Sequence, residues 1–270
     1  MSSRYDQRTT TFTPDGRLMQ VDYVLERINK CATAVGIKTD EGVVLAARRR
    51  ERHTLADKPV SEINNLSGDK LFAVDRHLAI AAAGLESDAM KFIDYARYLA
   101  HDHRATYQEP FLAEDLCQRL CDQCQQNSQK GGMRPFAVAF LVAAWDRHHG
   151  FQLYQTDPGG NYGAWNAYAM GENQATADSI LKTDWKPTLT LKEGLMLAVK
   201  VLAKTGDVVT PSPDRLEIAT LSRRPREEPT FQMLTVDELK PLVDEAERIR
   251  KAEEEEQERK ERQFEAQRAS

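Results

Sequence analysis

The chain has 270 residues, of which 41% are hydrophobic and 29% are charged, a balance typical of a globular protein with a sizeable apolar core. No apolar run reaches the ~18 residues of a membrane-spanning helix, so we expect no membrane partner. The formal net charge is −5, and residues 237–270 carry twelve acidic and eight basic side chains of the total. The remainder is nearly neutral, which argues against a nucleic-acid partner.

The N-terminal segment predicts ordered structure at an end where many chains fray. Pro14 and Gly16 flank an aspartate in a typical turn, because proline fixes φ and glycine accepts a positive φ. A helix should follow, because apolar residues recur from Leu18 to Ile28 at steps of three and four. This apolar stripe needs a covering surface, either on its own domain or on a neighbour.

The body of the chain predicts strands in runs and helices in pairs. Several strands, such as 138–144, are apolar at consecutive positions, which indicates that both faces are covered. Two sheets packed face to face with helix pairs outside satisfy these surfaces, so the predicted fold class is α+β, a four-layer αββα sandwich. We expect strands at 32–39, 43–48, 70–75, 77–84, 135–146, 150–156, 165–170, 214–223 and 230–234, and helices at 88–104, 112–127, 173–184 and 191–204.

Three cysteines recur on one face of the second predicted helix, at Cys117, Cys121 and Cys124. They could be part of a metal site or a redox pair, but buried small apolar residues are the favoured interpretation. The glycine-rich run 157–163 lacks the Lys-Ser/Thr of a phosphate loop and is interpreted as a turn between strands. The sequence therefore predicts no cofactor and no metal.

Thr190 is the expected N-cap of the helix at 191–204, with Glu193 three residues later. The last predicted helix begins at Thr235, where Glu238 completes a capping box. The stretch 248–270 has almost no apolar residues. Such a run is either a solvated helix or a disordered tail.

The opening residues include Tyr5-Asp6, Thr10, Phe12-Thr13-Pro14-Asp15-Gly16-Arg17-Leu18, Gln20-Val21-Asp22-Tyr23 and Gly36-Ile37. This run resembles the N-terminal signature of proteasome α subunits, from which Thr13 and Asp22 are conservative departures. The resemblance covers roughly residues 4 to 240. Within that family the type-4 group, at position α3 of the ring, is the most similar. An insertion around 59–67 departs from it and is expected in a surface loop.

The resemblance implies an N-terminal nucleophile hydrolase-like fold and a place in a seven-membered ring. The implied partners are neighbouring α subunits, β-ring subunits, and activators or a regulatory particle that dock through C-terminal tails. The implied role is in ubiquitin-dependent protein degradation in the cytoplasm and nucleus. Three regions follow: a gate segment at 1–17, the α-subunit domain at 18–247 with the N-terminal helix, and a charged tail at 248–270.

Catalysis by this chain is not expected. Alignment with the β subunits of the family, whose free N-terminal threonine is the nucleophile, places Ala32 at that threonine, Arg48 at the assisting aspartate and Lys70 at the assisting lysine. Alanine offers no nucleophile, and the preceding residues remove the free α-amine. A threonine peptidase of the same fold is thus disfavoured. A free-standing interaction module is the other alternative, but it would leave the apolar stripe of the N-terminal helix exposed to solvent.

The resemblance also implies two sets of site residues. A cluster that holds the open gate maps onto Tyr5, Asp6, Pro14 and Tyr23. A pocket that receives activator tails maps onto Lys70, which would pair with a terminal carboxylate, with Leu85 as an apolar wall. Cys31 stands where many members have glycine, so a bulkier pocket could weaken docking or change which activator fits.

Overall fold

The computed structural model describes residues 9–49, 55, 70–206, 212–224 and 227–249. The predictions for Tyr5, Asp6, the insertion near 59–67 and the tail from 250 onward lie outside these residues. Among the helices in the described ranges, none is both long and apolar enough to cross a bilayer.

The strands form two antiparallel five-stranded sheets. The first sheet has the order β10-β9-β2-β1-β8, with β1 at Ala34–Lys38, β2 at Gly42–Arg48, β8 at Ala167–Met170, β9 at Leu216–Ser222 and β10 at Thr230–Met233. The second has the order β3-β4-β5-β6-β7, with β3 at Leu71–Asp75, β4 at Leu78–Gly84, β5 at Val138–Asp146, β6 at Gly150–Thr156 and β7 at Tyr162–Ala164.

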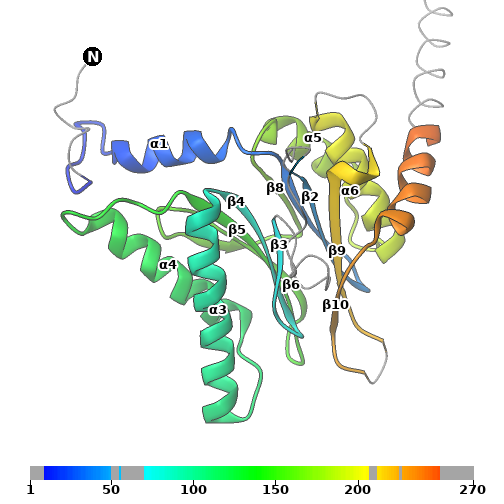
Figure 1. The fold of residues 1–270 in the computed structure, drawn as a ribbon, viewed down its shortest axis with the longest axis horizontal. Helices are drawn as coiled ribbons and strands as arrows, with labels where there is room; N and C mark the ends of the chain where they lie inside the picture. Colours follow the sequence, from blue (N-terminus) through cyan, green and yellow to red (C-terminus); the bar gives the residue numbers. More distant parts are fainter. Residues whose placement is uncertain (1–8, 50–54, 56–69, 207–211, 225–226, 250–270) are drawn as a thin grey trace, which may run out of the picture.

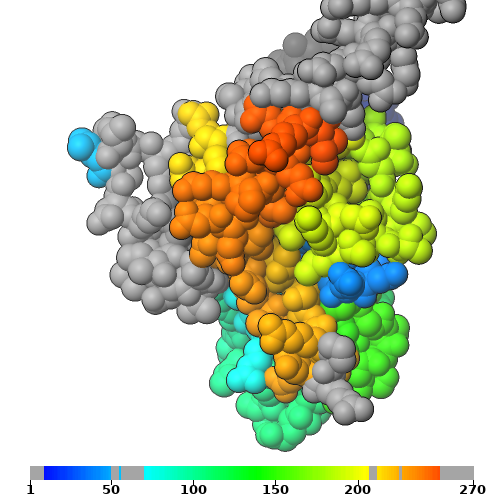
Figure 2. All heavy atoms as spheres, turned by 90° about the vertical axis from the view of Figure 1, so that its right-hand side faces the viewer, coloured from blue at the N-terminus to red at the C-terminus, as the bar shows by residue number. Residues whose placement is uncertain are grey.

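Helices cover the outer face of each sheet, which confirms the predicted four-layer αββα sandwich (Figure 1). One layer holds α3 and α4, and the opposite layer holds α5, α6 and the C-terminal helix at 236–249. In Figure 2 the C-terminal helix (orange) lies beside the yellow-green helices on the face toward the viewer. Helix α1 lies across one end of the sandwich (Figure 1). The helix bounds are α1 Met19–Ile28, α3 Glu86–Tyr107, α4 Ala113–Gln129, α5 Gln174–Asp184 and α6 Leu191–Thr205.

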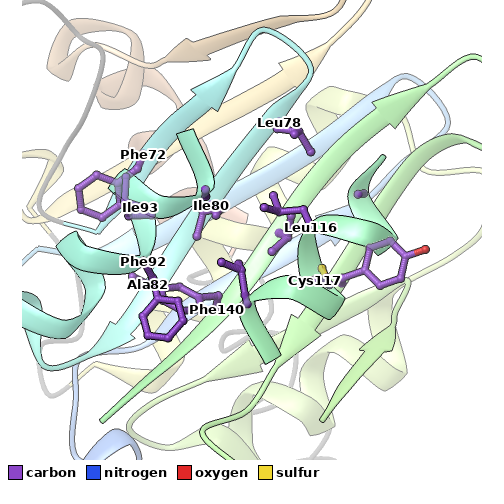
Figure 3. Packing of buried hydrophobic residues seen from close by; sticks show 14 of the residues in the cluster. Phe72, Leu78, Ile80, Ala82, Phe92, Ile93, Leu116, Cys117 and Phe140 are labelled. Atoms are coloured by element: carbon purple, nitrogen blue, oxygen red, sulfur yellow. The ribbon is translucent and has the colours of Figure 1, made fainter. Parts of the chain in front are cut away.

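Three apolar layers hold these elements together. Between the sheets, Leu45, Leu141 and Leu153 are each no more than 1% exposed. Under α3 and α4, Phe92 packs against Phe140, as Figure 3 shows. A third layer lies under α5, α6 and the C-terminal helix. Every residue of β5 from 138 to 144 is buried, as its unbroken apolar run predicted.

Two predicted helix starts are confirmed in atomic detail. The Thr190 side chain accepts a hydrogen bond from the Glu193 backbone N–H, and the Glu193 carboxylate accepts from the Thr190 N–H at 2.8 Å. Thr235 and Glu238 make the same reciprocal pair before the C-terminal helix. Each box satisfies backbone donors that a helix start otherwise leaves without partners.

The prediction that the whole glycine-rich run 157–163 forms a turn is wrong in part. A turn does form there, since the Gly160 N–H donates to the Asp157 carbonyl at 3.2 Å. However, the turn ends earlier than expected, and Tyr162–Ala164 pairs with β6 as the edge strand β7. A three-residue strand with one glycine lacks the alternation that would identify it in the sequence.

The cysteines of α4 are free and buried, which confirms the interpretation as core residues (Figure 3 labels Cys117). Burial raises the pKa of the Cys121 and Cys124 thiols to about 12, and that of Cys117 well above its ordinary value. Thiols that stay protonated at neutral pH are poor nucleophiles and poor metal ligands.

Candidate functional site

The site that the sequence singles out lies at the start of β1. Here the chain from Cys31 to Thr33 runs alongside Glu172, which follows β8. The Glu172 N–H donates to the Cys31 carbonyl at 2.7 Å, and the Thr33 hydroxyl donates to the Glu172 carbonyl at 2.8 Å. These bonds fix the backbone on both sides of Ala32.

The structure brings Lys70 to Ala32. Lys70 immediately precedes β3, and its Nζ donates to the Ala32 carbonyl oxygen. Arg48, at the end of β2, pairs instead with Glu172 through Nη2 and Oε2 at 2.9 Å. Ala32, Arg48 and Lys70, the positions that the resemblance assigned to nucleophile, aspartate and lysine, therefore lie together in a hydrogen-bonded scaffold.

The residue after Ala32, Thr33, carries a hydroxyl group. This side chain is 1% exposed and already donates to Glu172. A nucleophile needs access to substrate and a base within hydrogen-bond reach. Thr33 has no such access, so it does not replace the hydroxyl that Ala32 lacks.

The residues expected to form the pocket surround this scaffold. Cys31 places its Sγ 3.3 Å from the Arg27 carbonyl, at the end of α1, and 3.7 Å from the Gly84 carbonyl. Leu85 follows Gly84 directly and is 39% exposed. Ala32, whose carbonyl accepts the hydrogen bond from Lys70, directly follows Cys31 in the chain. Cys31, Leu85 and Lys70 therefore lie around one small region, between the end of α1, the start of β3 and the end of β4.

A buried carboxylate holds the Leu85 side of this region. Asp88, in the first turn of α3, accepts two hydrogen bonds from Arg134 at 2.7 Å and one from the Ala137 N–H at 3.0 Å. Burial raises the pKa of the Asp88 carboxyl, but these hydrogen bonds outweigh burial, so the pKa lies below its ordinary value. The Leu85 N–H also donates to the Ala137 carbonyl at 2.7 Å.

The described gate residues lie on the surface. The predicted turn around Pro14 forms, with the Gly16 N–H donating to the Thr13 carbonyl at 2.9 Å and Gly16 at φ +77°. Pro14 is exposed, and Tyr23, on α1, is 41% exposed. Both can therefore contact a neighbouring chain.

Sequence reasoning missed the acidic residues that hold the site. Glu172, Glu217 and Asp88 contact partners 46 to 147 positions away in the chain. For Glu217 there is one signal, because it is the single charged residue within the apolar strand 216–222.

Comparisons with known proteins match both the N-terminal signature and the body of the chain. The family model described as "Proteasome subunit" matches residues 28–221, and a second model, for the N-terminal signature of the A-type proteasome subunits, matches residues 5–26. The chain is 43% identical to the proteasome alpha type-4-A subunit of Arabidopsis thaliana, over 90% of this chain and 95% of that protein. It is 42% identical to the proteasome alpha type-4 subunit of Dictyostelium discoideum, over 91% of this chain and 96% of that protein.

Proposed function

The chain belongs to the proteasome α-subunit family, and on that basis we propose that it is a non-catalytic member of the α ring in the type-4 position. It would assemble with neighbouring α subunits and with the β ring, in the cytoplasm and nucleus. The observation that carries the proposal is the N-terminal signature, followed by a β1 start with Ala32 where a hydroxyl nucleophile would be needed.

The proposal extends to activator docking at the region of Lys70, Cys31 and Leu85. An ammonium group near an exposed apolar side chain such as Leu85 suits a peptide tail that ends in a free carboxylate. Lys70 is half-buried and bonded to a backbone carbonyl, so it is already directed toward Cys31 and its surroundings. A tail that enters there would find a fixed positive charge without having to order a long side chain.

Replacing Lys70 with alanine should weaken activator binding while ring assembly stays intact. A charge-assisted hydrogen bond contributes about 1.5–3 kcal/mol, which corresponds to roughly a tenfold to hundredfold loss of affinity for a tail. Native mass spectrometry measures assembly, and titration with activator measures binding. Lys192→Ala is the matched control, because Lys192 is an exposed lysine on α6. Equal binding by both variants would show that Lys70 does not contribute to docking.

The gate is the second part of the proposal. Tyr5, Asp6, Pro14 and Tyr23 are proposed to hold the open conformation, with Asp6 accepting hydrogen bonds from a neighbouring chain of the ring. Asp6→Ala should reduce activator-stimulated peptide hydrolysis by the assembled particle severalfold. Hydrolysis after the gate is opened by mild detergent should not change. Wild-type stimulation of the variant would exclude Asp6 from the gate.

A further inference from the structure

Hydrogen bonds hold both the backbone and the side chain of Lys70. Its carbonyl accepts from the Ala82 N–H at 2.9 Å, which begins the pairing of β3 with β4. Its Nζ donates to Ala32. Its own backbone N–H donates to the Glu217 carboxylate at 3.1 Å. The third contact comes from the other sheet.

Glu217 is an unusual residue for its place. It lies on β9 opposite Ala47 of β2 and is 1% exposed. Its neighbours on the same face of β9, Ala219 and Leu221, belong to the apolar layer between the sheets. The carboxylate of Glu217 therefore crosses from the first sheet to the backbone of Lys70, at the start of the second.

Placing a carboxylate in this apolar layer is unfavourable unless hydrogen bonds within the protein compensate for its lost hydration. An apolar side chain would fill the same volume at lower cost, so packing does not explain the choice of glutamate. What glutamate provides here is a directed acceptor. It fixes the position from which the Lys70 side chain extends toward Ala32 and Cys31.

We propose that Glu217 is a positioning residue for the docking pocket, and that it holds Lys70 where the ammonium can meet the terminal carboxylate of a bound peptide. This inference rests on the proposed function of Lys70. It adds a residue that touches no ligand itself and that acts from the opposite sheet through a hydrogen bond to the Lys70 backbone.

The test uses assembled particles and a short synthetic peptide with a free C-terminus and a photo-crosslinking group, with the C-terminally amidated peptide as the blank. The readout is the peptide concentration for half-maximal crosslinking to this chain. Glu217→Met should raise that concentration about tenfold, within the usual coupling of residues that share a hydrogen bond. Glu217→Gln retains an acceptor oxygen and should stay within about twofold of wild type.

A double-mutant cycle separates positioning from a general structural effect. In the Lys70→Ala background, Glu217→Met should change crosslinking by less than about twofold, because the charge that it positions is gone. Thr220→Val is the control, since Thr220 is buried on β9 but points to the opposite face. It should leave crosslinking at the wild-type level.

The outcomes are distinct. If Lys70→Ala weakens crosslinking but Glu217→Met does not, the positioning role is wrong and the docking site stands. If Glu217→Met has an equal effect with and without Lys70, its role is structural and the inference is again wrong. If Lys70→Ala has no effect, the proposed docking function itself fails.

Should Glu217→Met not assemble, Glu217→Asp retains the charge on a shorter side chain. It should weaken crosslinking severalfold, and wild-type crosslinking by that variant would overturn the inference.

Discussion

Replacing Gly84 with alanine is expected to destabilise the chain by more than about 3 kcal/mol. Gly84 ends β4 with φ +141°, a backbone conformation that side chains rarely adopt. A Cβ at this position would lie 2.1 Å from the Ala137 carbonyl oxygen and 2.7 Å from the Val138 Cα. Both are backbone atoms, one in the residue before β5 and one in its first residue, so neither can move aside as a flexible side chain would.

Gly132→Ala is the matched control for this prediction. Gly132 also has a positive φ, +82°, but a Cβ there would meet no atom within 4 Å. Its substitution should cost only the left-handed backbone penalty of about 1–2 kcal/mol. Urea unfolding of the purified chains compares the two, with yield of assembled rings as a second measurement. A Gly84 variant no less stable than the Gly132 variant would contradict the steric argument.

The second large effect is expected at Arg134. Arg134→Ala removes two charge-assisted hydrogen bonds from the buried Asp88 carboxylate and leaves it the Ala137 N–H as a donor. Removing one partner of a buried ion pair is more damaging than the pair is stabilising. We expect a loss of about 2–4 kcal/mol at neutral pH, toward the lower end because the Arg134 side chain is 61% exposed. Urea unfolding at pH 7 measures it.

The dependence of this loss on pH identifies its cause. In the wild type the pKa of Asp88 is lowered on folding, so the ionised carboxylate stabilises the folded state. This stabilisation is complete at pH values above the unfolded pKa of about 3.9, and it is lost as the pH falls through the folded pKa. Without Arg134, burial should raise that pKa, and protonation would then relieve the uncompensated charge. The difference in unfolding free energy between wild type and variant should therefore shrink between pH 7 and about pH 4.

Arg76→Ala provides the comparison at a surface pair. Arg76 and Glu228 lie 2.9 Å apart, but their side chains are 72% and 74% exposed. Such pairs contribute about 0–1 kcal/mol, so the variant should resemble wild type at all these pH values. A pH-independent loss at Arg134 would instead point to packing of its aliphatic stem.

Local signals predicted most of the fold. The capping pairs at Thr190 and Thr235, the apolar run of β5 and the turn at Gly16 each depend on residues within a few positions. Their physics is contained in one element, so the sequence is sufficient to find them. The edge strand β7 was missed because three residues carry too little pattern.

The candidate site was only half predictable. The resemblance assigned Ala32 and Lys70 to positions of one catalytic site, but it gave no indication of what holds them. Glu217 contacts Lys70 across 147 positions, and the partner of Arg48 is Glu172, 124 positions away. A single sequence gives no indication of which distant acid reaches which donor, because that depends on how two sheets are stacked.

The sheet orders also bear on how the chain behaves before it meets a partner. In the described residues, the outermost strands are short: β3 has five residues, β7 three, β8 four and β10 four. The longest strands, β5 with nine residues and β2, β4, β6 and β9 with seven each, lie inside their sheets. Short edge strands offer few unpaired backbone groups to another chain. We therefore expect a newly made chain to resist edge-to-edge aggregation before it assembles with other subunits.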